Sequence, residues 1–485
     1  MRKFLLLSLL AGIAVVIWQL TAPLIAAEPP QGRTRQEVIS EIQNGYAKDG
    51  APTNEINQRI AAANQIWDAA EAKGLDTTTT YALVGDVMQK NIAMIPGIAS
   101  EAQQVINNTD FSNVPIHENS KGLLISNISI AQYENLPPSR VQEMTKTLIE
   151  VASDPKVPQD NLAASSMILG AVAQGVAQGL SDEQAKQRGN AVVTVAEQLS
   201  AQGLSGEQIS SGLVAATNSI GQNASPEEAV RVANISINAI GAGASEAATF
   251  STSETITAAV KTSGDAQTVA SAAIGAADEA IKAQQSSLAG EVAGTTTGNA
   301  MLNNIPVDQA NQMGRQAGEM VAQLEQQFGA LPAAAAGETI STGIIKQEDP
   351  QLVENAAELA VTKAVEIQNN GGSPSAMQLG GELVGSGILA GQTQEEAFQV
   401  ADVGVAAYNN QIENGEGMLF AEQSADAAVS DNSQSSGDAE HAPPQGEADK
   451  YPQQESPDED PIVAPALGLQ QGPSVVDPNA TSQDP

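Results

Sequence analysis

A short helix-opening phrase recurs along the middle of this chain and limits its fold more than any other feature. It reads Gly-Leu-Ser-Asp-Glu-Gln at residues 179–184 and Gly-Leu-Ser-Gly-Glu-Gln at 203–208, and looser copies follow at 223–228 and 243–246. Each copy ends one run of small apolar residues and begins another. A phrase repeated about every 20 to 24 residues in this way predicts a stack of short helices.

The residues between these phrases have the spacing of helices with one buried face. Small or apolar residues recur three and four positions apart, which places them on one side of a helix. They are Ala185, Gly189, Val192, Ala196 and Leu199 in the first unit, Ile209, Leu213, Ala216 and Ile220 in the second, and Val230, Ala233, Ile237 and Ile240 in the third. Ser181 with Gln184, and Ser225 with Glu228, fit the capping box that satisfies free amides of a first helical turn. Pro226 suits such a turn because its missing N–H has no helical partner there.

Further units extend the pattern to about residue 410. It weakens between 241 and 297, returns at 307–328 and 352–367, and ends in two units opened by Ser373 and by Thr393. The faces of these two units are Met377, Gly380, Val384 and Gly387, then Ala397, Ala401, Gly404 and Tyr408. Such faces bury too little area for a lone helix and are stable only when stacked. We therefore expect about ten short helices between residues 160 and 410, paired as hairpins in an all-α solenoid or irregular bundle.

Helical spacing also marks the region that precedes the repeats. It is clear from 36 to 73, after a short exposed leader, and Ser139 caps a further expected helix that ends near Ala152. Residues 124–130 alternate in a way compatible with a single strand, although irregular packing is the favoured interpretation from 110 to 138. We therefore divide this part of the chain into a mainly helical N-terminal region, 28–158, and a helical-repeat region, 159–410.

The first 27 residues have the order of a secretory signal peptide. Arg2 and Lys3 precede an apolar stretch, and Leu-Ile-Ala-Ala at 24–27 offers a cleavage site before Glu28. The alternative is an uncleaved anchor, since the stretch is about long enough to cross a bilayer. We expect an exported protein that is periplasmic, on the cell surface or extracellular. Because the chain contains no cysteine, burial alone must hold it together.

The C-terminal segment, residues 411–485, differs from the rest. It contains nine prolines and fifteen acidic residues against a single lysine, Lys450. Such a segment buries too little surface to offset its chain entropy, so we expect a disordered acidic tail. Asp458, Glu459 and Asp460 suit only weak binding of divalent cations, because they lack the spacing and the glycine of a calcium loop. A solvated spacer is the simplest role, and docking to a basic partner is the alternative.

The charge balance excludes several classes of partner. The formal net charge is −36 at pH 7, and aromatic residues make up only 3% of the chain. Nucleic acids need a basic surface for their phosphates, and anionic membranes need one for their headgroups. Neither is therefore an expected partner, and we expect an unknown protein partner or self-association instead.

Side chains for most kinds of catalysis are scarce. His117 and His441 are the only histidines, and without cysteine the usual zinc sites are excluded by number. The glycine-rich pieces lack the lysine and the strand context of phosphate-binding loops. Most of the conspicuous acids stand at expected helix starts, where they favour the positive end of the helix dipole. They are Asp182, Glu183, Glu227, Glu228, Glu395 and Glu396. We therefore assign no catalytic, cofactor-binding or metal-binding residue, and no cofactor.

These observations predict a non-enzymatic, exported helical scaffold that acts by self-association or by binding a partner in the cell envelope or extracellular space. One alternative is a membrane-anchored envelope protein that keeps its N-terminal segment. The other is a carboxylate-dependent hydrolase in the irregular region between residues 76 and 140. Its candidate acids are Asp76, Asp86, Glu101 and Glu118.

Overall fold

The computed structural model describes residues 34–48, 51, 53–90, 92–111, 114–155, 157–158, 161–262 and 265–439. All regular structure in these ranges is helical, which confirms the all-α class. None of the helices described there is long and apolar enough to cross a membrane. The chain divides into two units, Met1–Gly437 and Asp438–Pro485, and the packing below concerns the first. The expected signal peptide and the acidic cluster at 458–460 lie outside the described residues.

The helices follow one another with short connections. Those of the first half are α2 (Arg35–Lys48), α3 (Thr53–Lys73), α4 (Thr77–Met88), α5 (Ile95–Asn108), α6 (Glu118–Tyr133), α7 (Pro138–Ala152), α8 (Leu162–Ala177), α9 (Asp182–Ala201), α10 (Gly206–Gly221) and α11 (Pro226–Gly241). Those of the second half are α12 (Glu246–Ser251), α13 (Ser253–Thr262), α14 (Ala266–Gln284), α15 (Ser287–Leu302), α16 (Val307–Phe328), α17 (Ala330–Ala334), α18 (Gly337–Ile345), α19 (Pro350–Asn369), α20 (Pro374–Leu389), α21 (Gln394–Glu413) and α22 (Met418–Ala439).

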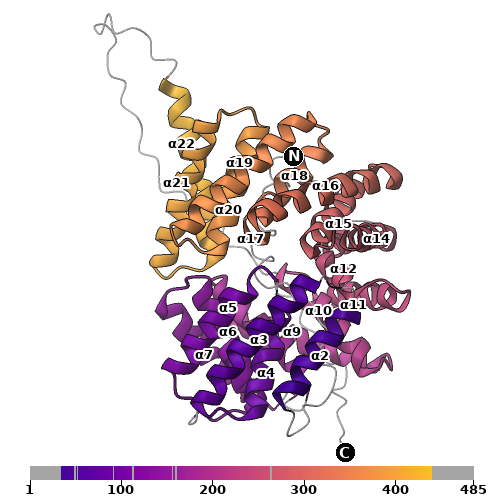
Figure 1. Ribbon diagram of the computed structural model, residues 1–485, viewed down its shortest axis with the longest axis vertical. Helices are drawn as coiled ribbons and strands as arrows, with labels where there is room; N and C mark the ends of the chain where they lie inside the picture. Colours follow the sequence, from indigo (N-terminus) through magenta and orange to yellow (C-terminus); the bar gives the residue numbers. More distant parts are fainter. Residues whose placement is uncertain are drawn as a thin grey trace, which may run out of the picture. The chain divides into compact units, whose positions relative to one another are not determined.

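These helices form two alternating series. The first series is α4, α6, α8, α10, α12, α15, α17, α20 and α22, whose members begin at residues 77, 118, 162, 206, 246, 287, 330, 374 and 418, which are 40 to 44 residues apart. The second series is α3, α5, α7, α9, α11, α14, α16, α19 and α21. A helix packs mainly on the next helix in the chain and on the next member of its own series, as α4 packs on α6 and α14 on α16. Figure 1 follows this succession from α2 to α22.

The first series is buried more deeply than the second. Every residue of α8 is buried, so this helix has protein on all sides. In α9 only one side is buried, and it includes Ala185, Gly189, Val192 and Leu199, four of the residues predicted for that face. A helix that is apolar all round must lie in an interior, whereas a one-sided helix can face water. The first series therefore supplies the interior of the unit.

The repeated phrase begins helices as predicted. Ser181 and Ser225 form the expected capping boxes of α9 and α11, and Pro226 lies in the first turn of α11. Ser205 and Thr393 form two further boxes at the beginning of α10 and α21. Each box satisfies two of the amides that a first turn leaves without a helical partner.

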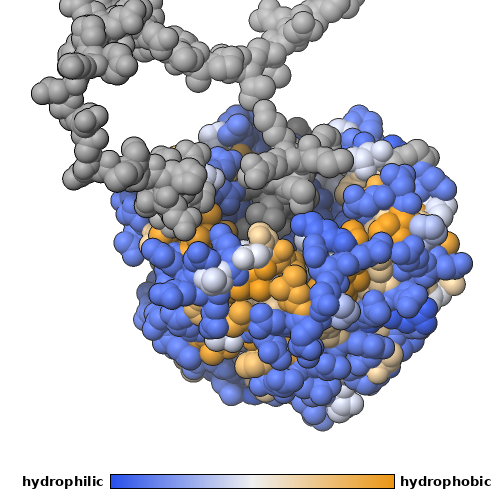
Figure 2. Space-filling model, turned by 90° about the horizontal axis from the view of Figure 1, so that it is seen from above, coloured by the Kyte–Doolittle hydropathy of each residue, from blue (hydrophilic) through white to orange (hydrophobic). Residues whose placement is uncertain are grey.

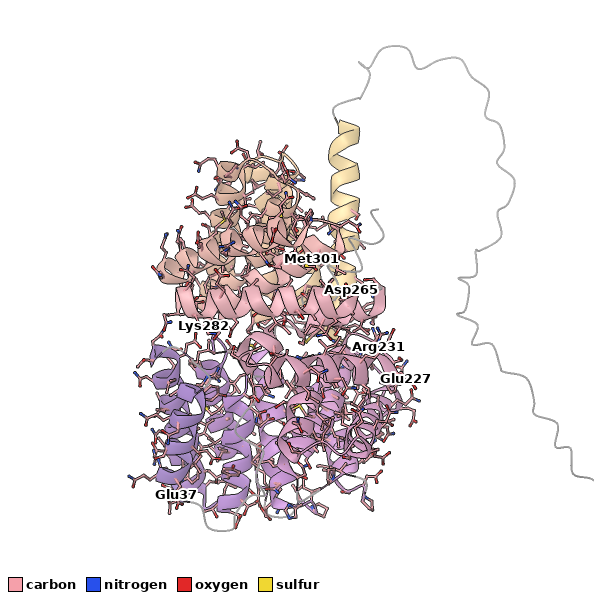
Figure 3. The ribbon with its side chains drawn as sticks, turned by 90° about the vertical axis from the view of Figure 1, so that its right-hand side faces the viewer. Glu37, Glu227, Arg231, Asp265, Lys282 and Met301 are labelled. Carbon is pink, nitrogen blue, oxygen red and sulfur yellow. The ribbon has the colours of Figure 1, made fainter. Side chains whose placement is uncertain are left out.

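Figure 3 shows α14 from the side, with Asp265 at its beginning and Lys282 near its end. Asp265 accepts a hydrogen bond from the amide of Thr268 at 3.2 Å. The hydroxyl and the amide of Thr268 lower the pKa of Asp265 below its usual value. An acidic residue at the start of a helix and a basic residue at its end both interact favourably with the helix dipole.

Residues 118–133 form the helix α6, so the irregular packing expected between 110 and 138 is wrong for this segment, as is the strand considered at 124–130. Nearly all of α6 is buried. Two of its polar side chains bond the helix itself: Asn127 donates to the carbonyl oxygen of Leu123 at 2.8 Å, and Ser129 to that of Ile125 at 2.7 Å. A helix enclosed in this way needs no polar face, so it lacks the 3.6-residue period of a half-exposed helix.

The number of helices also differs from the expected ten. Between residues 162 and 413 the described chain contains fourteen helices, from α8 to α21. Two members of the first series are broken, so that α12 and α13 occupy one position and α17 and α18 another. Four of the fourteen, α12 to α15, come from the segment in which the pattern weakened.

The sequence predicted a disordered tail from residue 411, but the helix α22 covers Met418–Ala439 and packs on the rest of the unit. The predicted boundary is therefore wrong for this helix. Met418, Ala421 and Ala425 of this helix are buried. Glu422 is buried on the same helix, and most of the remaining residues of α22 are small or polar, which made it resemble the tail. Residues 440–485 lie outside the described part. At the other expected boundary, residue 158, helices from both sides pack together, with α6 and α7 on α8.

Segments far apart in the sequence also pack together. Ser287, at the beginning of α15, donates from its hydroxyl to Glu55 of α3 at 3.0 Å, across 232 residues. Ser375, near the beginning of α20, donates in the same way to Glu134 at 3.0 Å, across 241 residues. The chain therefore turns back on itself, and Figure 1 shows the early helices α5 to α7 beside the late helices α20 to α22.

Neighbouring helices of the first series approach each other closely. A Cβ atom at Gly122 in α6 would lie 2.3 Å from the carbonyl oxygen of Thr79 and 2.7 Å from the amide nitrogen of Leu83. Both are backbone atoms of α4, which cannot rotate away as a side chain can. Contact between α4 and α6 therefore requires glycine at this position.

We predict that Gly122→Ala lowers the free energy of unfolding by about 1 to 3 kcal/mol, because the added methyl group forces α4 and α6 apart. The measurement is urea unfolding followed by circular dichroism. Gly170→Ala is the matched control, since Gly170 is also a buried glycine in a first-series helix but nothing lies within 4 Å of its added Cβ. That variant should be unchanged or up to about 1 kcal/mol more stable. Equal effects of the two substitutions would contradict close packing at Gly122.

Candidate functional site

Two of the four acids considered for the hydrolase alternative accept hydrogen bonds from residues close to them in the sequence. Asp76 is the N-cap of α4 and accepts a hydrogen bond from the amide of Thr78 at 2.7 Å. Glu101 of α5 accepts one from the side-chain amide of Gln104 at 3.1 Å. Capping explains Asp76 without a substrate.

Glu118 and His117 lie together at the beginning of α6. Glu118 forms an ion pair with Lys121 at 2.7 Å and accepts a hydrogen bond from the hydroxyl of Thr79 at 2.6 Å. His117 is the N-cap, where its Nδ1 accepts a hydrogen bond from the amide of Asn119 at 3.3 Å. Both residues therefore stabilise the start of the helix and its contact with α4.

Asp86 is the most deeply buried of the four candidates and joins three helices of the first series. It lies in α4 and forms an ion pair with Lys90 at 3.2 Å, with both side chains 2% exposed. The hydroxyl of Ser126 in α6 donates to one carboxylate oxygen at 2.6 Å, and the hydroxyl of Ser166 in α8 donates to the other. A buried ion pair is tolerated only where further hydrogen bonds satisfy the charged groups. Asp86 therefore stabilises the contact between α4, α6 and α8, and both of its carboxylate oxygens have partners.

A second set of carboxyl groups lies in the later helices, and the sequence reasoning missed it. Glu254, Glu338, Glu382 and Glu422 come from α13, α18, α20 and α22, with α15 between the first two. Glu382 and Glu422 are buried, and the other two are half-buried. Burial raises the pKa of Glu382 well above its usual value, and the charges of the other three raise it further.

Burial and neighbouring acids also raise the pKa values of Glu422 and Glu254. Burial raises the pKa of Glu422 to about 8, and the charge of Asp426 contributes. The pKa of Glu254 is raised first by burial and then by the charges of Glu338 and Glu291. A carboxylate in such an interior loses its hydration, and its neighbours carry the same charge. The interior around Glu422 therefore favours the protonated form of its carboxyl group.

A proton is the ligand to which these buried carboxyls are suited. Within the described ranges, no three Asp, Glu or His side chains are placed to hold a metal ion. The acidic cluster for which weak cation binding was expected, at 458–460, lies outside those ranges. Neutral carboxyl groups can donate hydrogen bonds and store protons, and both properties depend on pH.

An open groove runs along the ends of α5, α6 and α7. Its main part has a volume of about 500 Å³ and an adjoining part about 320 Å³, and the two share Gln132, Leu136 and Pro138. Polar side chains dominate the main part; they are Glu101, Gln104, Asn108, Thr109, Gln132, Asn135 and Glu413. Neither part is lined by a lysine or an arginine. The groove is therefore an acidic, amide-rich surface.

No protein-family model matches this chain, and no curated protein is similar to it in sequence. The geometry of the groove and of the buried carboxyls is therefore the basis for their function.

One of the buried carboxyls, that of Glu382, has a recognisable sequence context. Glu382 stands in Leu-Gly-Gly-Glu-Leu-Val-Gly at 379–385, and it is the single acid in a run of small and apolar residues. In a helix that packs on all sides, an acid within such a run must be enclosed as well. Acids at helix starts have a different setting, since polar capping residues surround them. This difference separates Glu382 from Glu395 and Glu396.

We predict that the protein is more stable near pH 5 than near pH 8. A carboxyl whose pKa is raised in the folded state stabilises the fold fully below its unfolded pKa, and this contribution is lost as pH rises through the folded pKa. The pKa is raised to about 7 for Glu134 and to about 8 for Glu422. Each such group changes the free energy of unfolding by at most about 1.4 kcal/mol per pH unit between the two values.

The measurement is the urea midpoint of unfolding at half-unit steps of pH. Exposed carboxyls with lowered pKa values, such as Glu150 and Glu396, act below this window and do not obscure it. A midpoint that rises from about pH 5 to about pH 8 would show that the interior carboxyls are ionised in the folded protein.

Proposed function

We propose that this chain is a non-enzymatic, exported helical scaffold that holds a partner in the cell envelope or outside the cell. The observation that carries the proposal is the regular spacing of the first series, whose members begin 40 to 44 residues apart and pack on their neighbours. Two-helix units of similar length that stack in order form a solenoid, and solenoids act through extended surfaces. The signal-like order of residues 1–27 supports export.

The groove along α5, α6 and α7 is the surface that we assign to the partner. Glu101 and Glu413 contribute carboxylates to it, and the groove has no lining cation, so a basic side chain is the complementary group. The amides of Gln104 and Gln132 can bond the backbone of an extended peptide. Leu136 offers apolar contact in both parts of the groove.

The overall charge supports the same type of partner. At a net charge of −36, the protein attracts basic molecules from a distance and repels acidic ones. Figure 2 shows one face of the molecule, on which polar residues surround a central group of apolar ones. From the carboxylates and Leu136 of the groove, together with this charge, we propose a partner segment that is extended and carries a lysine or arginine beside an apolar residue.

We predict that short peptides containing lysine and leucine bind the purified protein, and that matched peptides containing glutamate and leucine do not. The measurement is fluorescence polarisation of labelled peptides at low and high salt. The double substitution Glu101→Gln and Glu413→Gln should weaken binding several-fold, up to about tenfold, because two exposed ion pairs are lost. Added salt should weaken binding to the unsubstituted protein more than to this variant.

The matched control is the double substitution Glu183→Gln and Glu227→Gln, which removes the same charge at the starts of α9 and α11. Equal weakening by the two double variants would mean that the general charge, and not the groove, attracts the peptide. If no basic peptide binds and light scattering gives a multiple of the mass of the single chain, the scaffold acts by self-association instead.

A further inference from the structure

The end of α6 and the beginning of α7 contact the last helices of the described chain. One oxygen of Glu134 accepts hydrogen bonds from the hydroxyl of Ser375 at 3.0 Å and from its amide at 3.4 Å. Nε of Arg140 donates to the carbonyl oxygen of Gly415 at 2.8 Å, across 275 residues. We call the contact made by these four residues the clasp. It joins segments that are far apart along the chain and that also share one hydrophobic core.

Three buried carboxyl oxygens beside the clasp have no hydrogen-bond partner among the described residues. They are Oε1 of Glu134 and both oxygens of Glu422. These two residues are only 2% and 1% exposed. Tyr408 of α21 packs in the same hydrophobic core as Met418 of α22. Its pKa is raised by burial and then by the charges of Glu134 and Glu422. Ser375 satisfies only one oxygen of Glu134, and Glu422 has no donor at either oxygen. Ionised carboxylates with so few donors are strongly unfavourable in such a place, so the geometry suits the neutral acids.

The other charged groups around the clasp do not compensate these two acids. On α20, Glu382 is buried and is itself acidic, and on α22 Asp426 is half-buried. On α6, Tyr133 has a pKa raised by burial and then by the charge of Glu134. On α7, Arg140 is already paired with Glu143 at 2.8 Å. Ionisation would therefore leave Glu134 charged in the interior with Ser375 as its donor. It would also place the charge of Glu422 beside that of Asp426.

We propose that the clasp is a proton-operated latch, which is closed while Glu134 and Glu422 are protonated and opens when they ionise. Burial raises the pKa of Glu134 to about 7 and that of Glu422 to about 8, against a usual value of 4.5. Both groups therefore stabilise the closed clasp fully below about pH 4.5, and the stabilisation is lost as pH rises through about 7 to 8. The released protons go to the solvent.

Opening would alter the groove as well. Asn135 lines the groove from the α6 side of the clasp, and Glu413 lines it from the end of α21. The clasp adds polar contacts between these walls to the hydrophobic core that they share. Opening of the clasp therefore loosens the groove on this side.

The absence of cysteine allows a direct test on the full chain. Ser139 and Asn414 are exposed and lie beside the clasp, on its two sides. The double substitution Ser139→Cys and Asn414→Cys places one nitroxide label on each side. Double electron–electron resonance then measures the distance between the labels from about pH 5 to about pH 9. We expect one short distance in acid and a second, longer one whose population rises with a midpoint between about pH 7 and 8.

Adding Glu134→Gln and Glu422→Gln should keep the short distance at every pH, because the amides cannot ionise. Glu183→Gln with Glu227→Gln is the matched control and should titrate like the parent. Circular dichroism at each pH separates opening from global unfolding. A distance that is constant between about pH 5 and 9 in the parent would overturn the proposal, even if the glutamine variant fails to fold. So would a glutamine variant that folds and still opens with the parent's midpoint.

Discussion

The close approach of helices that carry small residues is the constraint on which the rest of this structure depends. At Gly122, α4 and α6 meet with almost no space for a side chain between their backbones. Helices this close leave little room for water, so polar groups inside must find partners in the protein. The hydroxyl of Ser129 bonds its own helix, and Asp86 bonds three helices. A carboxyl group without such a partner keeps its proton.

The contacts between early and late helices place two physical effects in opposition. Glu55 and Glu134 each accept hydrogen bonds from a serine at the start of a distant helix, an arrangement that favours the ionised acid. Burial favours the neutral acid, and for both residues it is the larger effect, so both pKa values are raised. The same contacts that turn the chain back on itself therefore respond to pH.

Local chemistry predicted much of the fold, and the enclosed parts escaped it for a physical reason. Capping residues such as Ser181 and Thr393 act on their own helix, so their pattern can be recognised without tertiary structure. The helix α6 is enclosed on all sides and has no polar face to reveal its period. Buried carboxyls such as Glu422 have an ordinary sequence context, and only packing distinguishes them from surface acids. The clasp depends on contacts across 241 residues, which no local pattern contains.

The central claim is that interior carboxyl groups remain protonated in the folded protein at neutral pH. Infrared spectroscopy tests it directly, because the carbonyl stretch of a neutral carboxylic acid is separate from the bands of carboxylates and amides. The account predicts an acid band that persists at about pH 6.5, weakens toward about pH 8.5, and is smaller in the variant with Glu134→Gln and Glu422→Gln. A folded protein with no acid band at about pH 6.5 would contradict it.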